Sequence, residues 1–209
     1  MNEKVAIIGD IHGNRAALTG ILGLLDDWKW AIVFVGDYVD RGNDSAGVID
    51  DLIDLSKSRD DTHFIAGNHD LAMKEAISSG NLFPFLSIGG ATTIKSYVST
   101  PREKVIEQLR QAVPDSHLEF LRNLIPCFVT REISVAHTSD DPIFEQSGSR
   151  YRVYGHTPTD DRRPRITENF AAIDTGCGSL PDGRLTCFLW PERGTLQVDA
   201  TGHPVPNRP

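Results

Sequence analysis

The sequence has few cysteines and no long hydrophobic segment. Its three cysteines, Cys127, Cys177 and Cys187, are odd in number, show no C-x-x-C spacing and lie among apolar or small residues. This pattern argues against a disulfide framework and predicts buried thiols in a reducing compartment. No apolar run approaches the ~20 residues that span a bilayer, and the first residues lack the basic and apolar regions of a secretion signal. We therefore expect a cytoplasmic protein with no membrane partner.

Basic residues are scarce relative to acidic ones. Lysine and arginine number 21 against 29 aspartates and glutamates, which gives a formal net charge of -8. This balance argues against binding of a nucleic acid polymer through bulk electrostatics. A set of carboxylates reserved for cations is one alternative origin of the acidity. With 209 residues, 39% of them hydrophobic, the chain suits one globular domain with a sizeable core.

The first third of the chain alternates strand and helix patterns. Short, β-branched apolar runs at 4–8, 31–35 and 62–66 predict buried strands. The segments between them show the apolar spacing of helices, each preceded by a residue that favours a helix start. Alternation of this kind predicts a parallel sheet.

The remainder of the chain shows two different patterns. Residues from about 71 to 125 have mostly helical spacing and predict an insertion at one side of the sheet. Strand patterns then return with short turns between them, which predicts a second, largely antiparallel sheet. These strands are expected at 127–130, 133–137, 151–155, 170–174, 185–190 and 195–199. We expect a single domain over residues 1–200 and a flexible tail at 201–209.

Three of the expected strands end in a glycine followed by polar residues. The sequences are GDIHG at 9–13, GDYVDRG at 36–42 and GNHD at 67–70, and two later strands end at a histidine. Because ligands bind outside the carboxyl ends of parallel strands, these side chains are expected to meet in one crevice. The set comprises Asp10, His12, Asp37, Asp40, Arg41, Asn68, His69, His137 and His156.

This set combines carboxylate and amide oxygens with imidazole nitrogens and contains no cysteine. Such donors suit divalent transition metals such as manganese, iron or zinc. Taken alone, each residue is also explained as a turn, capping or structural residue, whereas repetition at successive strand ends favours metal binding. The donors are too many for one ion and about enough for two that share a carboxylate. Two metals suit phosphoester hydrolysis, because they lower the pKa of a water that attacks phosphorus, while a histidine protonates the leaving oxygen.

The order of the motifs resembles the calcineurin-like metallophosphoesterases. The match runs from GDIHG through GDYVDRG, GNHD and a lone histidine to YGHTP and IDTG, over roughly residues 4–190. Within this family the chain is most similar to the bacterial phosphoprotein phosphatases of the lambda phage phosphatase type. The resemblance implies an α/β fold, a four-layer αββα sandwich of two mixed sheets.

The resemblance also implies a role for each residue of the set. Six residues would ligate two divalent ions, for which manganese is the first expectation and iron or zinc the alternatives. The first ion would be bound by Asp10 and His12, the second by Asn68, His137 and His156, and Asp37 would bridge the two. His69 would act as the general acid, oriented by Asp40, and Arg41 would contact the phosphate, with Asn68 also facing the substrate.

The chain departs from the family pattern at three places. Asp70 replaces the glutamate usual in GNHE, and VAHTS replaces the usual small-residue sequence after the fifth ligand. A Trp-Ile-Arg segment that supplies a further phosphate-binding arginine is absent before the last histidine. We expect Arg150 to bind substrate in its place, with Arg152 as the alternative.

From the resemblance we expect a metal-dependent phosphomonoester hydrolase that acts as a serine/threonine, and also tyrosine, protein phosphatase. Its partner would be a phosphorylated protein or a small phosphoester. One alternative is a symmetrical diadenosine tetraphosphate hydrolase, in which the basic run 162–165 would hold the polyphosphate. Another is a non-catalytic, metal-bound regulatory module, against which the complete ligand set and the intact His69 count.

Overall fold

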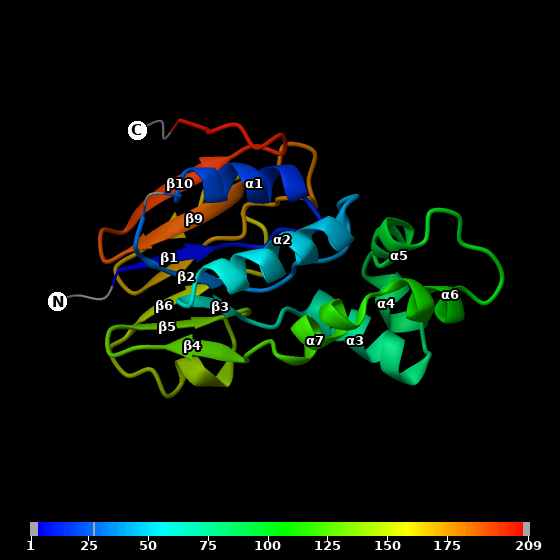
Figure 1. The fold of residues 1–209 in the computed structure, drawn as a ribbon. Coiled ribbons are helices and arrows are strands. Elements are labelled where there is room, and N and C mark those ends of the chain that lie inside the picture. The colour runs from blue at the N-terminus through cyan, green and yellow to red at the C-terminus, as the bar shows by residue number, and fades with distance from the viewer. Residues whose placement is uncertain (1–3, 27, 207–209) are drawn as a thin grey trace.

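The computed structural model describes residues 4–26 and 28–206, which form two facing β-sheets with helices (Figure 1). Within these ranges the first sheet has five strands in the order β10, β9, β1, β2 and β3. They span Gly194–Val198, Leu185–Trp190, Val5–Ile8, Ala31–Phe34 and Thr62–Phe64. β1, β2 and β3 are parallel, as the alternating pattern predicts, whereas β9 pairs antiparallel with β1 and β10.

In the same part of the chain the second sheet has five strands in the order β4, β5, β6, β8 and β7. They span Cys127–Val129, Ile133–Ala136, Tyr151–Tyr154, Phe170–Ala172 and Arg165–Ile166. The expected α/β fold with two mixed sheets is confirmed. The second sheet is not largely antiparallel, however, because β5, β6 and β8 run parallel. β9 and β10 belong to the first sheet, where β9 takes a central position and buries all its residues, as its apolar sequence requires.

Two helices cover the outer face of the first sheet. α1 (Arg15–Gly23) begins after Asn14, and α2 (Ser45–Ser58) begins after Asp44. The side chain of each capping residue accepts a hydrogen bond of 3.0 Å from a backbone N–H in the first turn. Such caps stabilise a helix by roughly 1 kcal/mol, and they place both helix starts directly after the GDIHG and GDYVDRG loops.

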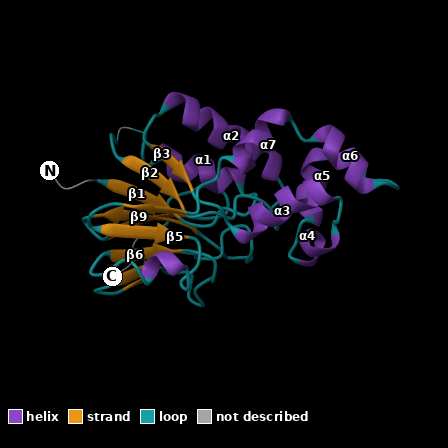
Figure 2. Cartoon of the chain, turned by 90° about the horizontal axis from the view of Figure 1, so that it is seen from below, coloured by secondary structure: helices purple, strands orange, loops and turns teal. Residues whose placement is uncertain are grey.

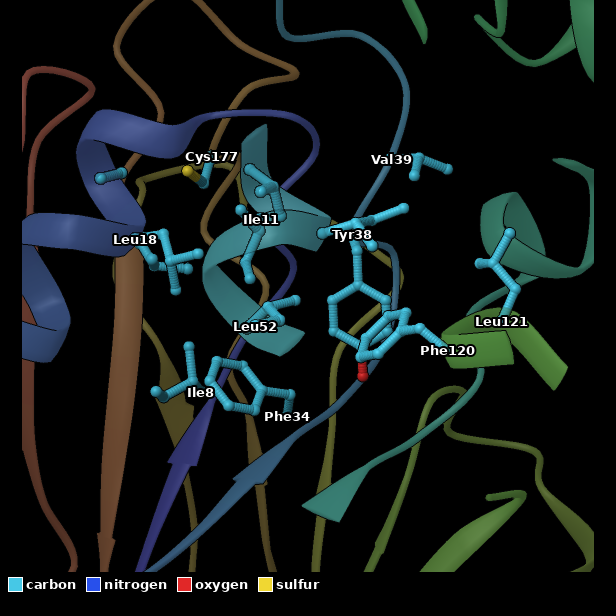
Figure 3. Packing of buried hydrophobic residues seen from close by; sticks show 14 of the residues in the cluster. Ile8, Ile11, Leu18, Phe34, Tyr38, Val39, Leu52, Phe120, Leu121 and Cys177 are labelled. Carbon is cyan, nitrogen blue, oxygen red and sulfur yellow. The ribbon is translucent and has the colours of Figure 1, made fainter. Parts of the chain in front are cut away.

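Side chains of the central strands alternate between two cores, because successive residues of a strand point to opposite faces. Ile8 of β1 packs with Leu18 and Leu52 of the two helices (Figure 3). Val5 and Ile7 pack instead against the second sheet. Each fully buried side chain of this kind contributes roughly 1.5–3 kcal/mol. The two cores fix the strand ends of both sheets relative to one another.

Among the described residues, five further α-helices lie beyond the carboxyl ends of β1, β2 and β3 (Figure 2). They are α3 (Asn68–Ser79), α4 (Phe83–Ser87), α5 (Ala91–Tyr97), α6 (Val105–Ala112) and α7 (Asp115–Arg122). α3 packs on α4, α6 and α7, and α2 contacts α5 and α7. These helices therefore stand beside the strand ends at which the polar motifs lie.

The outer face of the second sheet is covered by less helix than the outer face of the first sheet. The 3-10 helix η1 (Pro142–Phe144) contacts β5, and Ser147 after it donates a hydrogen bond of 2.9 Å to Ser134. One turn covers less surface than an α-helix. Tyr154 and Phe170, on the neighbouring strands, consequently remain half-buried.

Residues 201–206 return along α1 and β10. The Val205 N–H donates to the Gln197 carbonyl at 2.8 Å, and Gly202 lies so close to Gly20 of α1 that a Cβ at Gly20 would collide with it. The chain expected to be a flexible tail is thus held through residue 206, and 207–209 lie outside the described residues. No helix in the described part of the chain is long and apolar enough to cross a bilayer.

Candidate metal centre

Five strands deliver the polar motif residues to one crevice. The segments that follow β1, β2, β3, β5 and β6 meet beyond the carboxyl ends of these strands. Oδ2 of Asp37 lies 3.6 Å from Nε2 of His12, 3.9 Å from Nε2 of His69 and 3.4 Å from Nε2 of His137. All four side chains are almost fully buried. The structure therefore gathers residues from both sheets around one carboxylate.

The loops that carry these residues have an uncommon backbone. His12, Asp37 and His156 have φ angles of 46°, 55° and 71°, in the left-handed region that non-glycine residues rarely adopt. Such conformations cost on the order of 1–3 kcal/mol each and persist only where the surroundings impose them. The Asp37 N–H donates to Oδ2 of Asp70 at 2.8 Å, and its Oδ1 accepts the His69 N–H at 3.0 Å. These bonds fix the direction of the Asp37 side chain.

Two motif glycines are required by close approach. A Cβ at Gly67 would collide with Asp37, and a Cβ at Gly155 would collide with the carboxylate of Asp10. Only glycine leaves this space free. The glycines of GNHD and YGHTP thus allow buried carboxylates to lie against the neighbouring strand ends.

One donor group consists of His12, Asp37 and His69, whose ligand atoms all lie within 4.8 Å of one another. Nδ1 of His12 lies 3.0 Å from the Val39 carbonyl, which can only accept, so this nitrogen carries the proton and Nε2 the lone pair. Nε2 is buried and has no hydrogen-bond partner among the described residues. Burial lowers the pKa of His12 to about 4. The ring is therefore neutral, which is the form that binds a metal.

The second donor group consists of Asp37, His137 and His156. Nδ1 of His137 donates to the Val35 carbonyl at 3.0 Å, which directs Nε2 into the crevice. This Nε2 lies 3.1 Å from Nδ1 of His156 and 3.0 Å from Oδ1 of Asn68. Because Asp37 belongs to both donor groups, its carboxylate is placed to bridge two ions.

The crevice also concentrates buried negative charge. Burial raises the pKa of Asp10 and Asp174, and each lies near further carboxylates. Oδ2 of Asp174 is buried without a hydrogen-bond partner in the described chain. Burial lowers the pKa of His137, but Asp37 and Asp10 outweigh this effect and raise it to about 10, so the crevice favours positive charge. An unpartnered imidazole nitrogen, a shared carboxylate and excess negative charge fit divalent cations.

Asp10 and Asn68 lie at the margins of the two donor groups. The carboxylate of Asp10 accepts the backbone N–H of His156 at 3.2 and 3.0 Å. Four of the six ligands expected from the resemblance are the His and Asp members of the donor groups. Asn68 Oδ1 lies 3.0 Å from Nε2 of His137, and Asp10 accepts the His156 N–H, so both side chains supply further oxygens to the crevice.

A hydrogen-bonded triplet stands beside the donor groups. Nδ1 of His69 lies 2.7 Å from Oδ2 of Asp40, and Nη2 of Arg41 lies 3.2 Å from Nε2 of His69. Because the guanidinium can only donate, Nε2 accepts from Arg41 and the ring proton sits on Nδ1, facing Asp40. The second oxygen of Asp40 accepts the Thr93 hydroxyl at 2.6 Å. His69 is thus held from both sides, with Asp40 as its orienting partner.

Two residues of this site carry no role in the sequence-based assignment. Thr93 comes from α5, and no motif marks it. Asp70 was noted only as a departure from the family pattern, yet its carboxylate accepts the backbone N–H groups of Gly67, Asp37 and Tyr38 at 3.0, 2.8 and 3.0 Å. It therefore ties the GDYVDRG loop to the GNHD loop.

Arg150 does not join the site. It precedes β6, at the opposite end of that strand from His156, and its Nε donates to the Thr130 carbonyl at 2.9 Å. Arg152 lies over the ring of Phe170, 5.9 Å from its centroid. The expectation that Arg150 contacts the phosphate is therefore wrong, because a residue at the start of a parallel strand cannot reach a site at its carboxyl end.

Comparison with known proteins gives a family and a set of relatives. The model of the calcineurin-like phosphoesterase family matches residues 3–160. The asymmetrical bis(5'-nucleosyl)-tetraphosphatase PrpE of Bacillus mycoides (strain KBAB4) is 27% identical, and that of Geobacillus sp. (strain WCH70) is 29% identical, with 98% of both chains covered in each case.

Solved structures show the same fold at lower identity. A candidate diadenosine tetraphosphatase is 21% identical with a TM-score of 0.68, covering 95% of this chain and 94% of that chain. A cold-active protein-tyrosine phosphatase of a Shewanella species is 15% identical with a TM-score of 0.57, covering 97% and 80%. At these identities the likeness concerns the fold.

The names of the curated relatives correct one expectation. The motif resemblance pointed to a serine/threonine protein phosphatase, whereas the relatives that align along 98% of the chain are named dinucleoside tetraphosphatases. The protein phosphatase assignment is therefore wrong. The reason is physical: the motifs specify the phosphoryl-transfer centre, which both classes share, and not the surface that selects the rest of the substrate.

Proposed function

Because the family model covers residues 3–160, the chain belongs to the calcineurin-like phosphoesterases, as its motifs implied, and we propose that it hydrolyses bis(5'-nucleosyl) tetraphosphates. The observation that carries the proposal is the pair of donor groups that share Asp37, next to the His69–Arg41 pair. The names of the relatives that align along almost the whole chain support the substrate class.

The proposed cofactors are two divalent transition metal ions, with manganese as the first candidate. His12 and Asp10 would hold one ion, and His137, His156 and Asn68 the other, with Asp37 between them. Bound there, the metals would supply Lewis acidity and a water of lowered pKa. The protein contributes by fixing the tautomers of His12 and His137 through backbone carbonyls.

The residues beside the donor groups handle the substrate and the proton. The Arg41 guanidinium is exposed and can pair with two oxygens of the reacting phosphoryl group. When substrate draws Arg41 away from Nε2 of His69, this nitrogen becomes free to carry a proton to the leaving oxygen. Asp40 stabilises the resulting imidazolium, because its carboxylate lies 2.7 Å from Nδ1.

We propose asymmetrical cleavage, in which the products are one nucleoside triphosphate and one nucleoside monophosphate. The sequence-based alternative was a symmetrical hydrolase, which would release two nucleoside diphosphates. The asymmetrical name of the relatives supports the first outcome.

The test is a product analysis on metal-stripped protein reloaded with manganese. Diadenosine tetraphosphate is incubated with the enzyme, and the nucleotides are separated by anion exchange at low conversion. Equal amounts of ATP and AMP are expected, whereas ADP as the first product would show symmetrical cleavage. A serine-phosphorylated peptide runs in parallel. Turnover of the peptide with none of the dinucleotide would overturn the proposal.

A further inference from the structure

Two cavities flank the crevice, and arginines line both of them. One, of ≈ 720 Å³, lies beside Arg41 and includes Arg15 and Asn14 in its wall. The other, of ≈ 920 Å³, lies beside Ser139 and Thr157. Both volumes are in the range of roughly 300–1,000 Å³ that is typical of small-molecule sites. The second cavity begins one residue after His156 and two residues after His137, so it opens next to the second donor group.

The guanidinium groups of the two cavities have different partners. Arg15 in the first cavity forms a bidentate pair with Asp51 at 2.8 and 2.7 Å, which already satisfies its charge. Arg163 and Arg165 line the second cavity, are exposed and form no ion pair within the described part of the chain. We call this second cavity the arginine cavity. Neither guanidinium is held by a carboxylate in the described chain, and that of Arg165 lies over the Phe170 ring, 5.6 Å from its centroid.

The loop that carries these arginines is anchored. Nε of Arg162 pairs with Asp182 at 2.9 Å, and its Nη1 donates to the carbonyls of Thr159 and Asp160 at 3.1 and 2.8 Å. The Asp161 carboxylate accepts the Arg163 N–H at 3.0 Å. Arg162 therefore stabilises the loop and does not face the cavity as a free charge. The Asp161 carboxylate binds the backbone of the same loop. Asp160 and Asp161 are both exposed, so the lining carries two carboxylates beside its two guanidinium groups.

The remaining wall of the arginine cavity is apolar. Tyr154, Ile166 and two prolines line it. Tyr154 lies on the outer face of the second sheet, whereas Ile166 lies on the edge strand β7, opposite Ala171. This surface is open because η1 covers that face with a single turn. A cavity with two guanidinium groups, an aromatic side chain and a lining residue, Thr157, that directly follows His156 matches the chemistry of a nucleoside joined to a chain of phosphates.

We propose that the arginine cavity binds the part of the substrate beyond the reacting phosphorus, with Arg163 and Arg165 on the remaining phosphates and the nucleoside against Tyr154. This assignment rests on the proposed dinucleoside tetraphosphatase function. It adds that Arg163 and Arg165 select substrates with several phosphates. A small phosphoester such as p-nitrophenyl phosphate occupies the metal centre alone and does not reach the cavity. The two arginines therefore govern the KM of long substrates only.

The experiment compares Arg163→Gln/Arg165→Gln with Arg131→Gln, which removes a charge at the far end of the same sheet. For diadenosine tetraphosphate the double variant is expected to raise KM by about 10-fold or more with kcat within about twofold, since it removes two charge-assisted phosphate contacts. The kcat/KM for p-nitrophenyl phosphate should stay within about twofold in both variants. Ile166→Glu, which adds a carboxylate to the cavity lining next to Arg165 on β7, should also raise KM for the dinucleotide alone.

A binding measurement separates this inference from the proposed function. The β,γ-methylene analogue of ATP is titrated calorimetrically into the manganese-loaded wild type, double variant and Arg131→Gln. Weaker binding in the double variant alone supports the arginine cavity, even for a protein that does not hydrolyse the dinucleotide. The inference would be overturned if the double variant had the same KM for the dinucleotide and the same affinity for the analogue as the wild type. It would also be overturned if Arg131→Gln lost as much affinity as the double variant.

Discussion

Asp37 lies at the centre of the candidate site, and its two carboxylate oxygens contact different partners. Oδ1 accepts the His69 N–H, while Oδ2 faces the imidazoles of His12, His69 and His137 at 3.4–3.9 Å. Burial raises the pKa of Asp37, but its interactions with His137 and the other histidines outweigh that effect and keep the carboxylate ionised. An ionised oxygen between two donor groups is what a bridging ligand requires.

Replacing Asp37 tests the bridging role. Asp37→Asn keeps the shape but removes the charge, so bound manganese should fall to less than half of the wild-type content. Turnover should fall with it by on the order of 10²-fold or more, because even outer-shell changes at metal sites cost 10–100-fold. Metal is measured by plasma mass spectrometry on dialysed protein, with the exposed Asp54→Asn as control. Full metal content in Asp37→Asn would exclude a bridging carboxylate.

His69 is placed both in a donor group and beside Asp40, and these placements imply different roles. A cationic Arg41 at 3.2 Å from Nε2 disfavours a metal at the same nitrogen, so we assign His69 to proton transfer. His69→Asn should therefore retain its manganese while kcat falls by ~10²–10⁴-fold. Loss of one metal equivalent in this variant would instead identify His69 as a ligand.

At the scale of elements, the sequence predicted best those site residues that directly follow a strand, because the strand end fixes where such a residue lies. Asp37 and His137 could be placed because a Gly-terminated or histidine-terminated parallel strand has only one carboxyl end. Thr93 could not, because its contact with Asp40 joins positions 53 apart through the packing of α5, which no local pattern encodes. The prediction that Arg150 binds substrate was wrong for a related reason. Its charge and its nearness to His156 in sequence do not show that it lies at the opposite end of β6.

Sequence adjacency also misled the assignment of β9 and β10 to a sheet. β9 and β10 follow the second sheet in sequence with hairpin-like spacing, so adjacency favoured that sheet. Their place is decided by burial, since β9 packs between β1 and β10 and needs both faces covered. The proposed substrate selection depends on cavity walls built largely from the loops after β5 and β6, which no local sequence pattern identifies.

The helices beyond the strand ends are joined by one buried histidine. Nε2 of His117 in α7 lies 2.8 Å from Asp50 of α2, and its Nδ1 lies 2.8 Å from the Tyr97 hydroxyl of α5. α5 carries Thr93, so this junction supports the residue that holds Asp40. The histidine therefore has a structural role, linking α2, α5 and α7.

His117→Phe should lower the free energy of unfolding by about 1–3 kcal/mol, because it keeps the ring but leaves the buried Tyr97 hydroxyl without its partner. Urea unfolding followed by circular dichroism measures this loss. His63→Phe is the matched control, since His63 packs on Phe128 at 4.7 Å and forms no hydrogen bond in the described chain. A loss in His117→Phe no greater than in the control would mean that the junction contributes no stability.

At the scale of the whole molecule, the candidate centre joins the two sheets. His12 and Asp37 follow strands of the first sheet, whereas His137 and His156 follow strands of the second. Without cations, the ionised Asp37 carboxylate is buried at this junction, and burial raises the pKa of Asp10 and Asp174, which opposes their ionisation. Metal binding should therefore stabilise the fold as a whole, in addition to any effect on catalysis.

Removal of metal with a chelator should lower the melting temperature. A metal present at 100 times its Kd stabilises the folded state by about 2.7 kcal/mol, which corresponds to roughly 5–10 °C for a chain of this size. Differential scanning calorimetry of chelated and manganese-reloaded protein measures the shift. In Asp37→Asn the shift should shrink, because one carboxylate shared by both donor groups is gone, whereas in Asp54→Asn it should remain. Equal melting temperatures for chelated and reloaded wild type, with metal content verified, would show that the sheets are held by their hydrophobic core alone and that the buried charge at their junction is neutralised by protonation.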